Sequence, residues 1–579
     1  MRLVVQTEIP DDENLRRDWN ALVERAHEPR VFYTYEWALA VQRAYASALR
    51  PLLFLGYRGE NDLRGVAALA TTPANQRVSF LCATTGDYCD FLSLPEERET
   101  FITAVLLELR KRNCGEIALT NLPRNSVSAP GLHQAAERSH YFHFARTAYM
   151  CAQVSLKMLK RQGQGKIGLP RKRMVHRFLA AMGREGLVRL EHARSWDVVE
   201  PLLPTFTKTH VARFLSTGRL SNMISSERRM FLGELARQLS KTHWLALTRL
   251  QVGEKTAAWH YGFQFAGTWC WYQLTFDGAM GKYSPGFCLL SKMIEEAADN
   301  PVFHTVDLGL GTEEYKEQLA NGKRETVYVT LNASRLRHIS QLLRHHTAAA
   351  LKKQPLAERG TRSLLASYDK LKRRLRRGGI LDTCRWAAKR LRNSIAGRDE
   401  VFFYDLTDPD PALPTMAGVC LRPLDLNALA MAAMQNETDE GTLAYLLRCA
   451  RHLRIDQWEG FALVNDAGEF LHFAWAGPFD GFYCSEVAAV LNSPAPDSIL
   501  LFDSWTPVSR RGKQYYSSTI ALVAKRLLSE GKRSWIFSAS TNLSSVGALR
   551  KAGLKRCFSV IRYRVLWWQR VVQEKLASN

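Results

Sequence analysis

The sequence predicts a mixed α/β protein with several domains. Its 579 residues are too many for one hydrophobic core and are typical of about three or four domains. Strand-like and helix-like segments alternate in three stretches, within 1–165, 175–335 and 400–579. A basic, helix-like segment at 336–398 separates the second stretch from the third. We therefore expect two α/β halves, a helical linker and a further α/β domain with these boundaries.

The first stretch contains a hairpin, a further strand and an amphipathic helix. Residues 50–59 and 63–72 have the composition of two paired strands, and 78–94 that of a strand followed by a turn. The apolar residues of 99–113 recur at helical spacing. A glycine-rich, basic segment at 163–174 then interrupts the pattern. We place the end of the first half there.

The second stretch begins with helices and continues with strands. Helical spacing is found at 171–186, 196–214 and 225–241, strand patterns at 242–252, 255–267 and 268–277, and a helix at 286–297 leads to a strand at 303–311. Several strands that look antiparallel, followed by a helix between two more strands, make a second α/β unit.

The linker carries most of the excess positive charge. The net charge of the chain is +23, and residues 335–398 hold 18 Lys plus Arg against three acidic residues, which gives +15. One apolar helical face is expected in it, formed by Leu364, Leu365, Tyr368, Leu371 and Leu375. Such a helix lies on anionic lipid, binds RNA, or is a linker with a solvated basic face. The sequence leaves these three interpretations open.

The third stretch contains another series of strands and helices. Residues 459–487 read as strands with a hairpin turn at 466–468, because an Asp-x-Gly turn interrupts the apolar run. They are followed by a strand at 498–508, a helix at 516–531, a strand at 534–540, a helix at 544–553 and a last aromatic strand at 559–568. The result is a third α/β domain.

Composition excludes several protein classes. The eleven cysteines include no CxxC pair, and Cys82 and Cys89 lack the further ligands of a zinc site. We expect no metal and free thiols in a reducing cytoplasm. No window approaches the ~18 apolar residues of a membrane span, so we expect a cytoplasmic protein, with peripheral attachment to the inner membrane left open. No P-loop, G-x-S-x-G or H-E-x-x-H pattern is present.

A Ser-Pro-Gly turn stands directly before the helix at 286–297. Ser284 is a suitable cap, Pro285 suits the first helical turn, and Gly286 allows another group to approach the backbone. A helix start of this kind is suited to an anion such as phosphate. A capped structural helix would have the same residues, so both interpretations stand.

Residues 256–322 resemble the CelD-type acyltransferases of bacterial cellulose and exopolysaccharide clusters, a GNAT branch akin to the Fem-type peptidoglycan aminoacyltransferases. The resemblance rests on an aromatic strand pair and on four motifs, Asp277, Tyr283-Ser284-Pro285-Gly286, Asp307-x-Gly309 and Glu314-Tyr315-Lys316. It extends less specifically over about 20–335. It implies a Fem-like double GNAT body in which Ser284, Pro285 and Gly286 receive the phosphates of an acyl-CoA donor. Acetyl-CoA is the first candidate for that donor.

The third stretch resembles the GNAT acyltransferases more generally. In that family the turn before the helix at 516–531 binds the donor's pyrophosphate through backbone amides, and Arg511, Gly512, Lys513 and Asn542 match the motif. Gln514 and Tyr516 stand where the family has small residues, and Leu549 where many members have a tyrosine acid. The resemblance therefore implies the fold more firmly than the activity.

Acyl transfer of this kind needs little covalent help from the protein. A neutral amine attacks the activated carbonyl, while the protein supplies proximity, an N–H for the oxyanion and a proton acceptor. Under the resemblance, the catalytic candidates are His260, Asp277, Asp307, Tyr315 and Lys316. The substrate candidates are Asp87, Asp90, His210, Trp271 and Tyr272.

Each candidate also has a structural interpretation. His260 is alternatively a satisfied histidine of the sheet, and Asp277 the start of a turn. Asp307 and Lys316 are alternatively an ion pair, and Trp271 a core residue. Asp87 and Asp90 equally suit a loop turn.

We therefore expect an N-acyltransferase that moves an acyl group from acyl-CoA to an amine of a sugar, a polysaccharide precursor or a small metabolite. A first alternative keeps the fold but takes aminoacyl-tRNA as donor, with the basic helices on RNA. A second is a non-catalytic scaffold of a polysaccharide-synthesis complex. An anionic membrane surface is a candidate partner of 335–398. The acceptor, the acyl chain length, the active lobe and the oligomeric state stay open.

Overall fold

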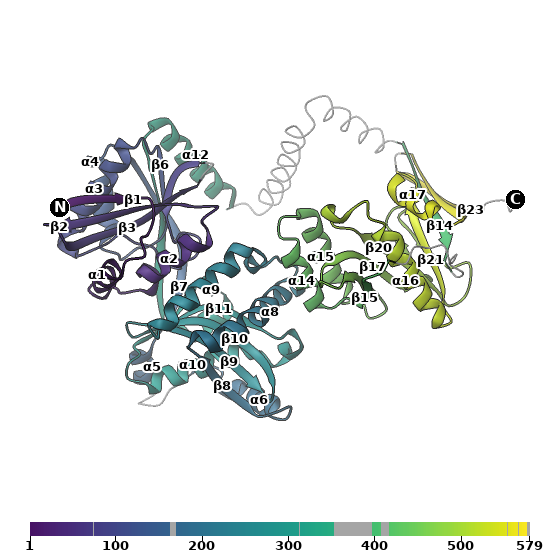
Figure 1. Cartoon of the computed structure of the whole chain (residues 1–579), viewed down its shortest axis with the longest axis horizontal. Helices are drawn as coiled ribbons and strands as arrows, with labels where there is room; N and C mark the ends of the chain where they lie inside the picture. The colour runs from purple at the N-terminus through teal and green to yellow at the C-terminus, as the bar shows by residue number, and fades with distance from the viewer. Residues whose placement is uncertain are drawn as a thin grey trace. The chain divides into compact units, whose positions relative to one another are not determined.

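The chain folds into two compact units, each with its own sheet (Figure 1). The computed structural model describes residues 1–72, 75–162, 169–311, 313–352, 396–406, 416–552, 554–565 and 567–575. One unit consists of 1–213 and 225–349, and the other of 214–224 and 350–579. The mixed α/β fold class is confirmed. Most of the predicted linker, with its apolar helical face, lies outside the described residues.

Up to Lys352 the strands are β1(Arg2–Gln6), β2(Arg50–Arg58), β3(Asp62–Thr72), β4(Asn75–Phe80), β5(Leu92–Ser93), β6(Glu116–Pro123), β7(Phe142–Ser155), β8(Val188–Ala193), β9(Leu245–Val252), β10(Lys255–Phe265), β11(Thr268–Phe276), β12(Thr305–Leu310) and β13(Gly322–Asn332). The α-helices of this part are α1(Glu13–Glu24), α2(Tyr35–Ala44), α3(Arg98–Lys111), α4(Ser128–Arg138), α5(Leu156–Gln162), α6(Lys172–Gly183), α7(Trp196–Val199), α8(Leu203–Ser216), α9(Ser226–Lys241), α10(Pro285–Asp299), α11(Glu314–Leu319) and α12(Arg335–Lys352). Short 3-10 turns are η1(Val31–Tyr33), η2(Pro95–Glu97), η3(Glu200–Leu202), η4(Asn222–Ile224) and η5(Gly278–Tyr283).

The two predicted halves of this part share one sheet. Its strand order is β1-β2-β3-β4-β6-β13-β7-β12-β11-β10-β9-β8, with β5 on β3. β13 comes from the end of the second half, yet it lies between β6 and β7 of the first. The long strand β7 continues past it to pair with β12. The halves are therefore joined by hydrogen bonds along two strands, and their boundaries in sequence remain a prediction.

The helices follow the sequence patterns, with one break. The helix expected at 196–214 is divided into α7, η3 and α8, because Pro201 and Pro204 have no N–H to continue a helical ladder. α9 begins where the side chain of Ser225 accepts the amide of Arg228. α3 and α4 bury their apolar faces on the strands of the first half, through residues such as Phe101.

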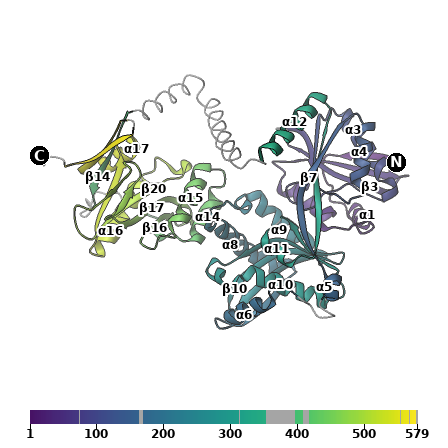
Figure 2. The ribbon, with the colours of Figure 1, turned by 180° about the vertical axis from the view of Figure 1, so that it is seen from behind.

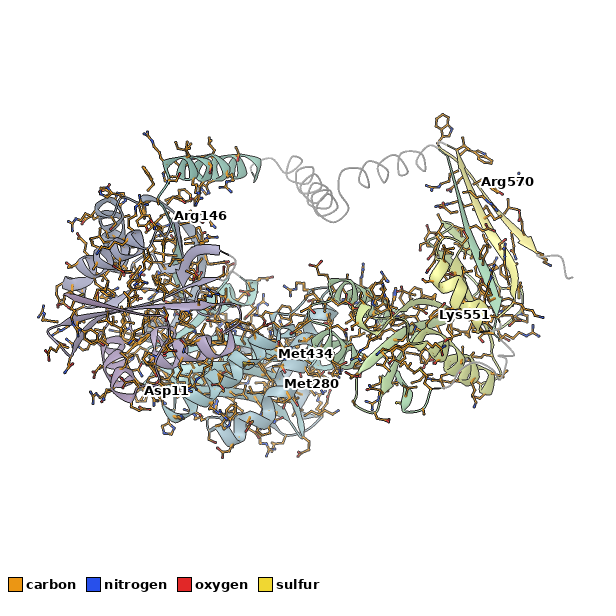
Figure 3. The ribbon with its side chains drawn as sticks, turned by 45° about the horizontal axis from the view of Figure 1, so that its top comes forward. Asp11, Arg146, Met280, Met434, Lys551 and Arg570 are labelled. Carbon is orange, nitrogen blue, oxygen red and sulfur yellow. The ribbon has the colours of Figure 1, made fainter. Side chains whose placement is uncertain are left out.

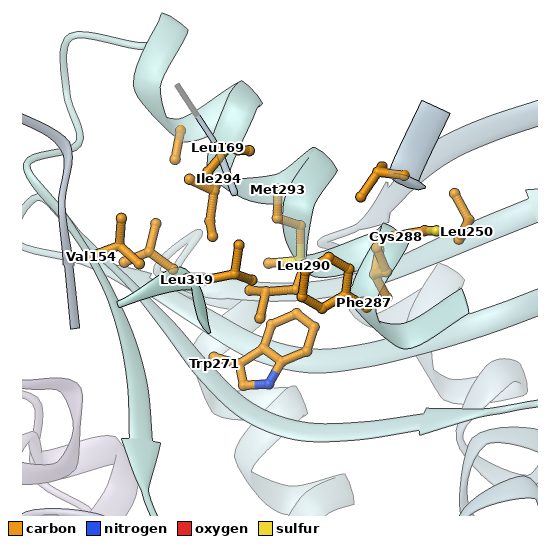
Figure 4. Close-up of a cluster of buried hydrophobic side chains, with 14 of the residues drawn as sticks. Val154, Leu169, Leu250, Trp271, Phe287, Cys288, Leu290, Met293, Ile294 and Leu319 are labelled. Atoms are coloured by element: carbon orange, nitrogen blue, oxygen red, sulfur yellow. The ribbon is translucent and has the colours of Figure 1, made fainter. Parts of the chain in front are cut away.

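The core of the second half lies between α10 and the sheet. Figure 4 shows Phe287, Leu290 and Met293 of α10 packed with Trp271 of β11 and Leu319 of α11. All five side chains are buried. This cluster fixes α10 against β11 and β12, and it fills the space beneath the first turn of the helix.

From residue 396 onward the strands are β14(Ala396–Asp405), β15(Val419–Pro423), β16(Glu459–Asn465), β17(Phe470–Pro478), β18(Phe482–Cys484), β19(Ala489–Leu491), β20(Ser498–Trp505), β21(Arg533–Ala539), β22(Arg556–Val565) and β23(Trp568–Lys575). The helices are α14(Leu426–Gln435), α15(Glu440–His452), α16(Tyr515–Ser529) and α17(Leu543–Lys551), with the 3-10 turn η6(Val508–Arg510).

The C-terminal unit has one main sheet with the order β15-β16-β17-β20-β21-β14-β22-β23, and a separate hairpin of β18 and β19. β20 and β21 are parallel neighbours linked by α16, and the other pairs of the main sheet are antiparallel (Figure 2). α16 packs on β16, β17 and β21 through Ile520, Val523 and Leu527. The sequence did not predict α14, α15, β14 or β15. The strand expected at 559–568 is found as β22, but β22 ends at Val565 and the chain turns into β23, which was not predicted.

Candidate functional site

The strands of the C-terminal unit separate beside α16. β20 and β21 pair only as far as Leu501 and Ile536. Beyond that point Trp505 of β20 pairs with β17, and Phe537 of β21 pairs with β14. A cavity of about 1020 Å³ lies at this separation and is lined by residues of both strands and by the start of α16. The volume is that of a site for a cofactor-sized ligand.

The first turn of α16 presents free backbone amides to this cavity. Gly512 has φ +80° and Gln514 has φ +60°, so the chain enters the helix through two left-handed residues. Among the residues that the structure describes, no side chain caps the helix. The amides of Tyr515, Tyr516 and Ser517 therefore lack an acceptor, as first-turn amides do. Such a turn attracts anions.

Cationic side chains surround the same turn. Arg511, Lys513 and Lys551 line the cavity, and Lys551, labelled in Figure 3, comes from the end of α17. Arg511 is fixed by a hydrogen bond of 3.2 Å from its Nε to the carbonyl of Thr506, and it lies over the ring of Trp505. Within the described part of the chain Lys513 and Lys551 form no ion pair. The turn therefore combines free amides with positive charge.

Tyr516, one of the residues that depart from the family motif, has its side chain directed toward α17. The hydroxyl of Tyr516 lies 3.0 Å from Oγ of Ser545 on α17, and its ring is buried, which raises the pKa of Tyr516 to about 12. Asn542 caps α17 by accepting the amide of Ser545 at 3.3 Å. Tyr516 thus lies against α17 at the base of the cavity. Asn542, predicted as a donor ligand, lines the cavity but has a capping role.

His472 of β17 is a polar group in the cavity wall that the sequence did not indicate. Its Nδ1 lies 2.7 Å from Oγ1 of Thr506, while its buried Nε2 has no partner among the described residues. Burial lowers the pKa of His472 to about 3, so the ring is neutral near pH 7. If Nδ1 donates to Thr506, Nε2 is a hydrogen-bond acceptor. No motif surrounds this residue, so only its contacts identify it.

Strand β20 is irregular where it leaves β21. Its pairing with β17 shifts register between Phe502 and Trp505, and Asp503 has φ +45°. Arg448 holds the Asp503 carboxylate with two bonds of 2.7 Å, and His452 with one of 2.8 Å. Burial opposes ionisation, but these donors outweigh it and keep the pKa of Asp503 below its ordinary value. A bulge of this kind leaves strand amides unpaired, here in the cavity wall.

The second half has a comparable strand separation, but its helix start is packed. β11 and β12 pair from Thr268 to Cys270, after which β12 pairs with β7. Ser284 has φ +47°, and its carbonyl accepts the amides of Phe287 and Cys288. A Cβ on Gly286 would lie 3.1 Å from the Leu274 side chain. The close approach that this glycine allows is thus made by strand β11, and Pro285, Gly286 and Phe287 are buried.

Asp307 is a buried carboxylate that joins the two halves through several hydrogen bonds. Its carboxylate accepts hydrogen bonds from Arg30 at 3.1 Å, Tyr88 at 3.0 Å and Gln153 at 2.8 Å, and from the amide of Gly309. The ion pair expected between Asp307 and Lys316 is not formed. Lys316 instead donates to the Leu310 carbonyl at 2.7 Å and pairs with Glu313 at 2.9 Å. Both side chains thus have structural partners.

The other catalytic candidates of this half also have partners. His260 accepts the amide of Tyr272 at 3.2 Å and stacks on Trp271, with ring centroids 4.2 Å apart. Burial, and then the nearby His192, lowers the pKa of His260 to about 3. Trp271 donates to the hydroxyl of Tyr315 at 3.3 Å.

Asp277 caps η5 by accepting the Ala279 amide at 3.0 Å. It therefore has the turn role that its position in the sequence also suggested. The exposed start of η5 places it outside the group formed around Asp307.

Two substrate candidates of the first unit, Asp87 and Tyr272, lie near Asp307. Asp87 packs against Gly309, and burial followed by the charge of Asp307 raises the pKa of Asp87 to about 7. Tyr272 donates to the Thr85 carbonyl and accepts a bond of 2.7 Å from the buried Arg228.

Two further candidates lie apart from this group. The Asp90 carboxylate accepts hydrogen bonds from the hydroxyl of Ser126 and from the amide of Phe91, and burial raises the pKa of Asp90. His210 of α8 is buried beside the ring of Phe206, and burial lowers its pKa to about 3. Of the candidates in this unit, Asp87, Asp307, Tyr272 and Lys316 are brought together.

Part of the chain is similar to known proteins. Residues 171–317 match the model of the acetyltransferase (GNAT) domain, and no curated protein matched the chain. Solved structures that resemble it include FemX (9% identity, 57% of this chain, 97% of that chain, TM-score 0.40) and L-PGS from Bacillus licheniformis (11%, 58%, 96%, 0.38). A third is a tandem GNAT protein from the clavulanic acid biosynthesis pathway (13%, 57%, 99%, 0.33).

Residues 171–317 thus match an acetyltransferase (GNAT) domain, and this match supports the predicted acyltransferase enzyme class. Across the described residues, no helix is long and apolar enough to cross a membrane. In the same residues, no group of three or more His, Cys, Asp or Glu side chains is placed to hold a metal ion.

Proposed function

We propose that the protein transfers an acyl group from acyl-CoA to an amine, and that the C-terminal cavity binds the donor. One observation carries this proposal. The uncapped first turn of α16 lies in a cavity of about 1020 Å³ together with Arg511, Lys513 and Lys551. Free amides and cations at a helix start are the chemistry that recognises phosphate groups.

The chain's own residues would bind the donor at two points. The amides of Tyr515, Tyr516 and Ser517, with Arg511 and Lys513, hold its phosphates. The separation of β20 and β21 leaves room for its acyl arm, because neither strand pairs with the other beyond Leu501 and Ile536. The donor supplies an activated thioester carbonyl.

The cavity wall offers groups for the transfer itself. The backbone is irregular at Asp503 and Ser504, and an amide of this segment is our candidate donor for the oxyanion that forms during attack. The neutral Nε2 of His472 is an acceptor that orients the N–H of the incoming amine. Since its pKa is about 3, His472 positions the amine and does not retain its proton. The amine must therefore enter as the free base. As the amide C–N bond forms, the C–S bond breaks, and the proton lost by the amine ends on the thiolate, which leaves as coenzyme A thiol.

The acceptor is proposed to be an amine because one exposed carboxylate stands in the cationic wall. Glu486 lines the cavity. Among the described residues, its carboxylate accepts hydrogen bonds only from its sequence neighbours, Sγ of Cys484 and Oγ of Ser485. A carboxylate at that place attracts an amino group before it is deprotonated. The CelD-type resemblance favours an amino sugar or a polysaccharide precursor as acceptor and acetyl-CoA as donor. Both choices rest on that resemblance.

Titration calorimetry of the full chain with acetyl-CoA tests the donor site. Arg511→Ala/Lys513→Ala should weaken binding by about 100-fold, since two charge-assisted contacts to phosphate are lost. The matched control, Lys282→Ala/Lys292→Ala, removes the two lysines beside the Ser284 turn and should leave the affinity unchanged. The opposite pattern would move the donor site to the second half. If the full chain does not bind acetyl-CoA at all, an aminoacyl-tRNA donor or a scaffold role would be favoured.

A further inference from the structure

The last hairpin of the chain exposes a group of apolar side chains. β22 and β23 pair antiparallel at the edge of the sheet, with Val565 opposite Trp568 and Tyr563 opposite Arg570. Trp567 is 90% exposed, Trp568 53% and Val565 52%. We call Tyr563, Val565, Trp567 and Trp568 the hairpin apex. Tryptophan is largely buried in most folded proteins, and neighbouring exposed apolar side chains mark an interaction site.

The hairpin that carries the apex is strongly basic. Residues 555–575 contain six Lys or Arg and one Glu, a net charge of +5. Arg562 and Arg564 are both held by Asp399, at 2.7 and 3.1 Å. Arg570 (Figure 3) and Lys575 form no ion pair with any described residue. Lys575 lies opposite Phe558, at the far end of the hairpin, whereas Arg570 lies opposite Tyr563 and borders the apex. Arg562 and Arg564 share the single carboxylate of Asp399, so the described residues leave excess positive charge beside the apex.

We propose that the hairpin apex docks the protein on an anionic membrane surface, with the indoles of Trp567 and Trp568 at the depth of the lipid headgroups. Tryptophan is favoured at that interface because its ring is apolar and its N–H is polar. Each cation near an anionic leaflet adds attraction that salt weakens. The proposal is independent of where the donor binds.

Two other partners fit these residues less well. Nucleic acid would stack on the indoles, but the aliphatic Val565 gains nothing from base stacking, whereas it gains from burial among acyl chains. A second copy could pair along β23, which is an edge strand. Arg570 and Lys575 oppose that pairing, because charged side chains on an edge disfavour a further strand.

Vesicle co-sedimentation of the full chain tests the proposal. The protein should bind vesicles of equal parts phosphatidylglycerol and phosphatidylcholine, and Trp567→Ser/Trp568→Ser should weaken this binding by about tenfold or more. Trp567→Phe/Trp568→Phe should recover most of it. The matched control, Leu187→Ser/Val302→Ser, removes side chains that are 68% and 63% exposed elsewhere and should bind as wild type does.

Three results would overturn the proposal. The first is equal vesicle binding by wild type and the double serine variant, which would assign any affinity to another segment. The second is equal binding to pure phosphatidylcholine vesicles. The third is a variant that loses affinity for a single-stranded RNA and keeps its affinity for vesicles. Unchanged thermal unfolding of the serine variant verifies that its fold is intact.

Discussion

Two helix starts in this chain follow a strand that separates from its parallel neighbour, and they differ in what surrounds them. At α10 the first turn is buried, and the Ser284 carbonyl takes the amide of Phe287. At α16 the first three amides have no acceptor among the described residues and lie in a large cavity. The region that matches the GNAT family model is thus the packed one. Family likeness and an open ligand site need not lie in the same part of a chain.

The two helix starts differ in the side chains that surround them. Leu274, Phe276 and Phe287 fill the space at the start of α10. Around α16 the cavity wall includes the small side chains of Ser504 and Ser538 together with larger ones such as Trp505. Apolar packing stabilises the second half, while the C-terminal unit leaves polar surface for a ligand. The following predictions separate the two regions, from the largest expected effect to the smallest.

The packed start of α10 should matter for stability and little for the donor. Phe287→Ala removes a buried ring and should destabilise its unit by about 3–5 kcal/mol. Phe403→Ala, in the core of the C-terminal unit, should do the same there. Differential scanning calorimetry with and without acetyl-CoA should show the ligand raising only the transition that Phe403→Ala lowers. A ligand shift in the transition lowered by Phe287→Ala would reverse our assignment.

His472 should affect transfer more than donor binding. His472→Phe keeps the ring but removes the acceptor Nε2, and we expect acyl transfer to fall by about 100-fold. Calorimetric affinity for acetyl-CoA should change by less than about threefold. His260→Phe, the matched change in the second half, should leave the rate constant of transfer unchanged in the folded enzyme. Equal losses for both variants would mean that transfer depends on both regions.

Asp87 should make the first unit less stable as pH rises. Its folded pKa of about 7 lies above the ordinary carboxyl value, so the folded state holds the proton more tightly and loses stability between about pH 4 and 7. Asp87→Asn should therefore stabilise the unit at pH 8 by about 1–2 kcal/mol, a figure reduced for solvent screening, and have little effect at pH 4. Chemical denaturation at both pH values measures this. A variant that is equally destabilised at both would show a structural hydrogen-bonding role instead.

The two glycines before these helices should respond differently to alanine. Gly512→Ala places a side chain at φ +80° and should cost about 1 kcal/mol, with weaker acetyl-CoA binding because the turn must shift. Gly286→Ala brings a Cβ to 3.1 Å from Leu274 and should cost a similar amount without changing the affinity. Denaturant unfolding measures the stability of both variants, and calorimetric titration measures their affinity for acetyl-CoA. Weaker acetyl-CoA binding by Gly286→Ala would contradict the prediction.

Much of the fold was predictable from local patterns. The hairpin of β2 and β3, the helices α3, α9, α10 and α16, and the order of strands and helices in the second half all follow from apolar spacing and turn residues. The elements that were missed have weaker patterns. The alanine-rich α14 and the exposed, charged β23 bury little apolar surface, so their sequences lack a clear alternation. β13 was equally unpredictable as a partner of β6 and β7, because pairing between distant strands depends on the whole sheet.

The candidate site was only partly predictable. Arg511, Gly512 and Lys513 were identified from their motif, and they line the cavity. His472 and Asp503 were not, since each depends on contacts from other strands or helices. The roles assigned to Asp307, Lys316 and His260 remain predictions, and each of these residues has partners that also explain it.

The sequence by itself determined where many helices start and where charge is concentrated. Only the tertiary structure decided which of the two helix starts is open. That outcome depends on contacts between residues far apart in the chain, such as Arg30 with Asp307 across 277 positions, and Leu274 with Gly286 across a strand and a turn. An amide is available to a ligand only when no neighbouring atom occupies its surroundings, and those neighbours are assembled by folding.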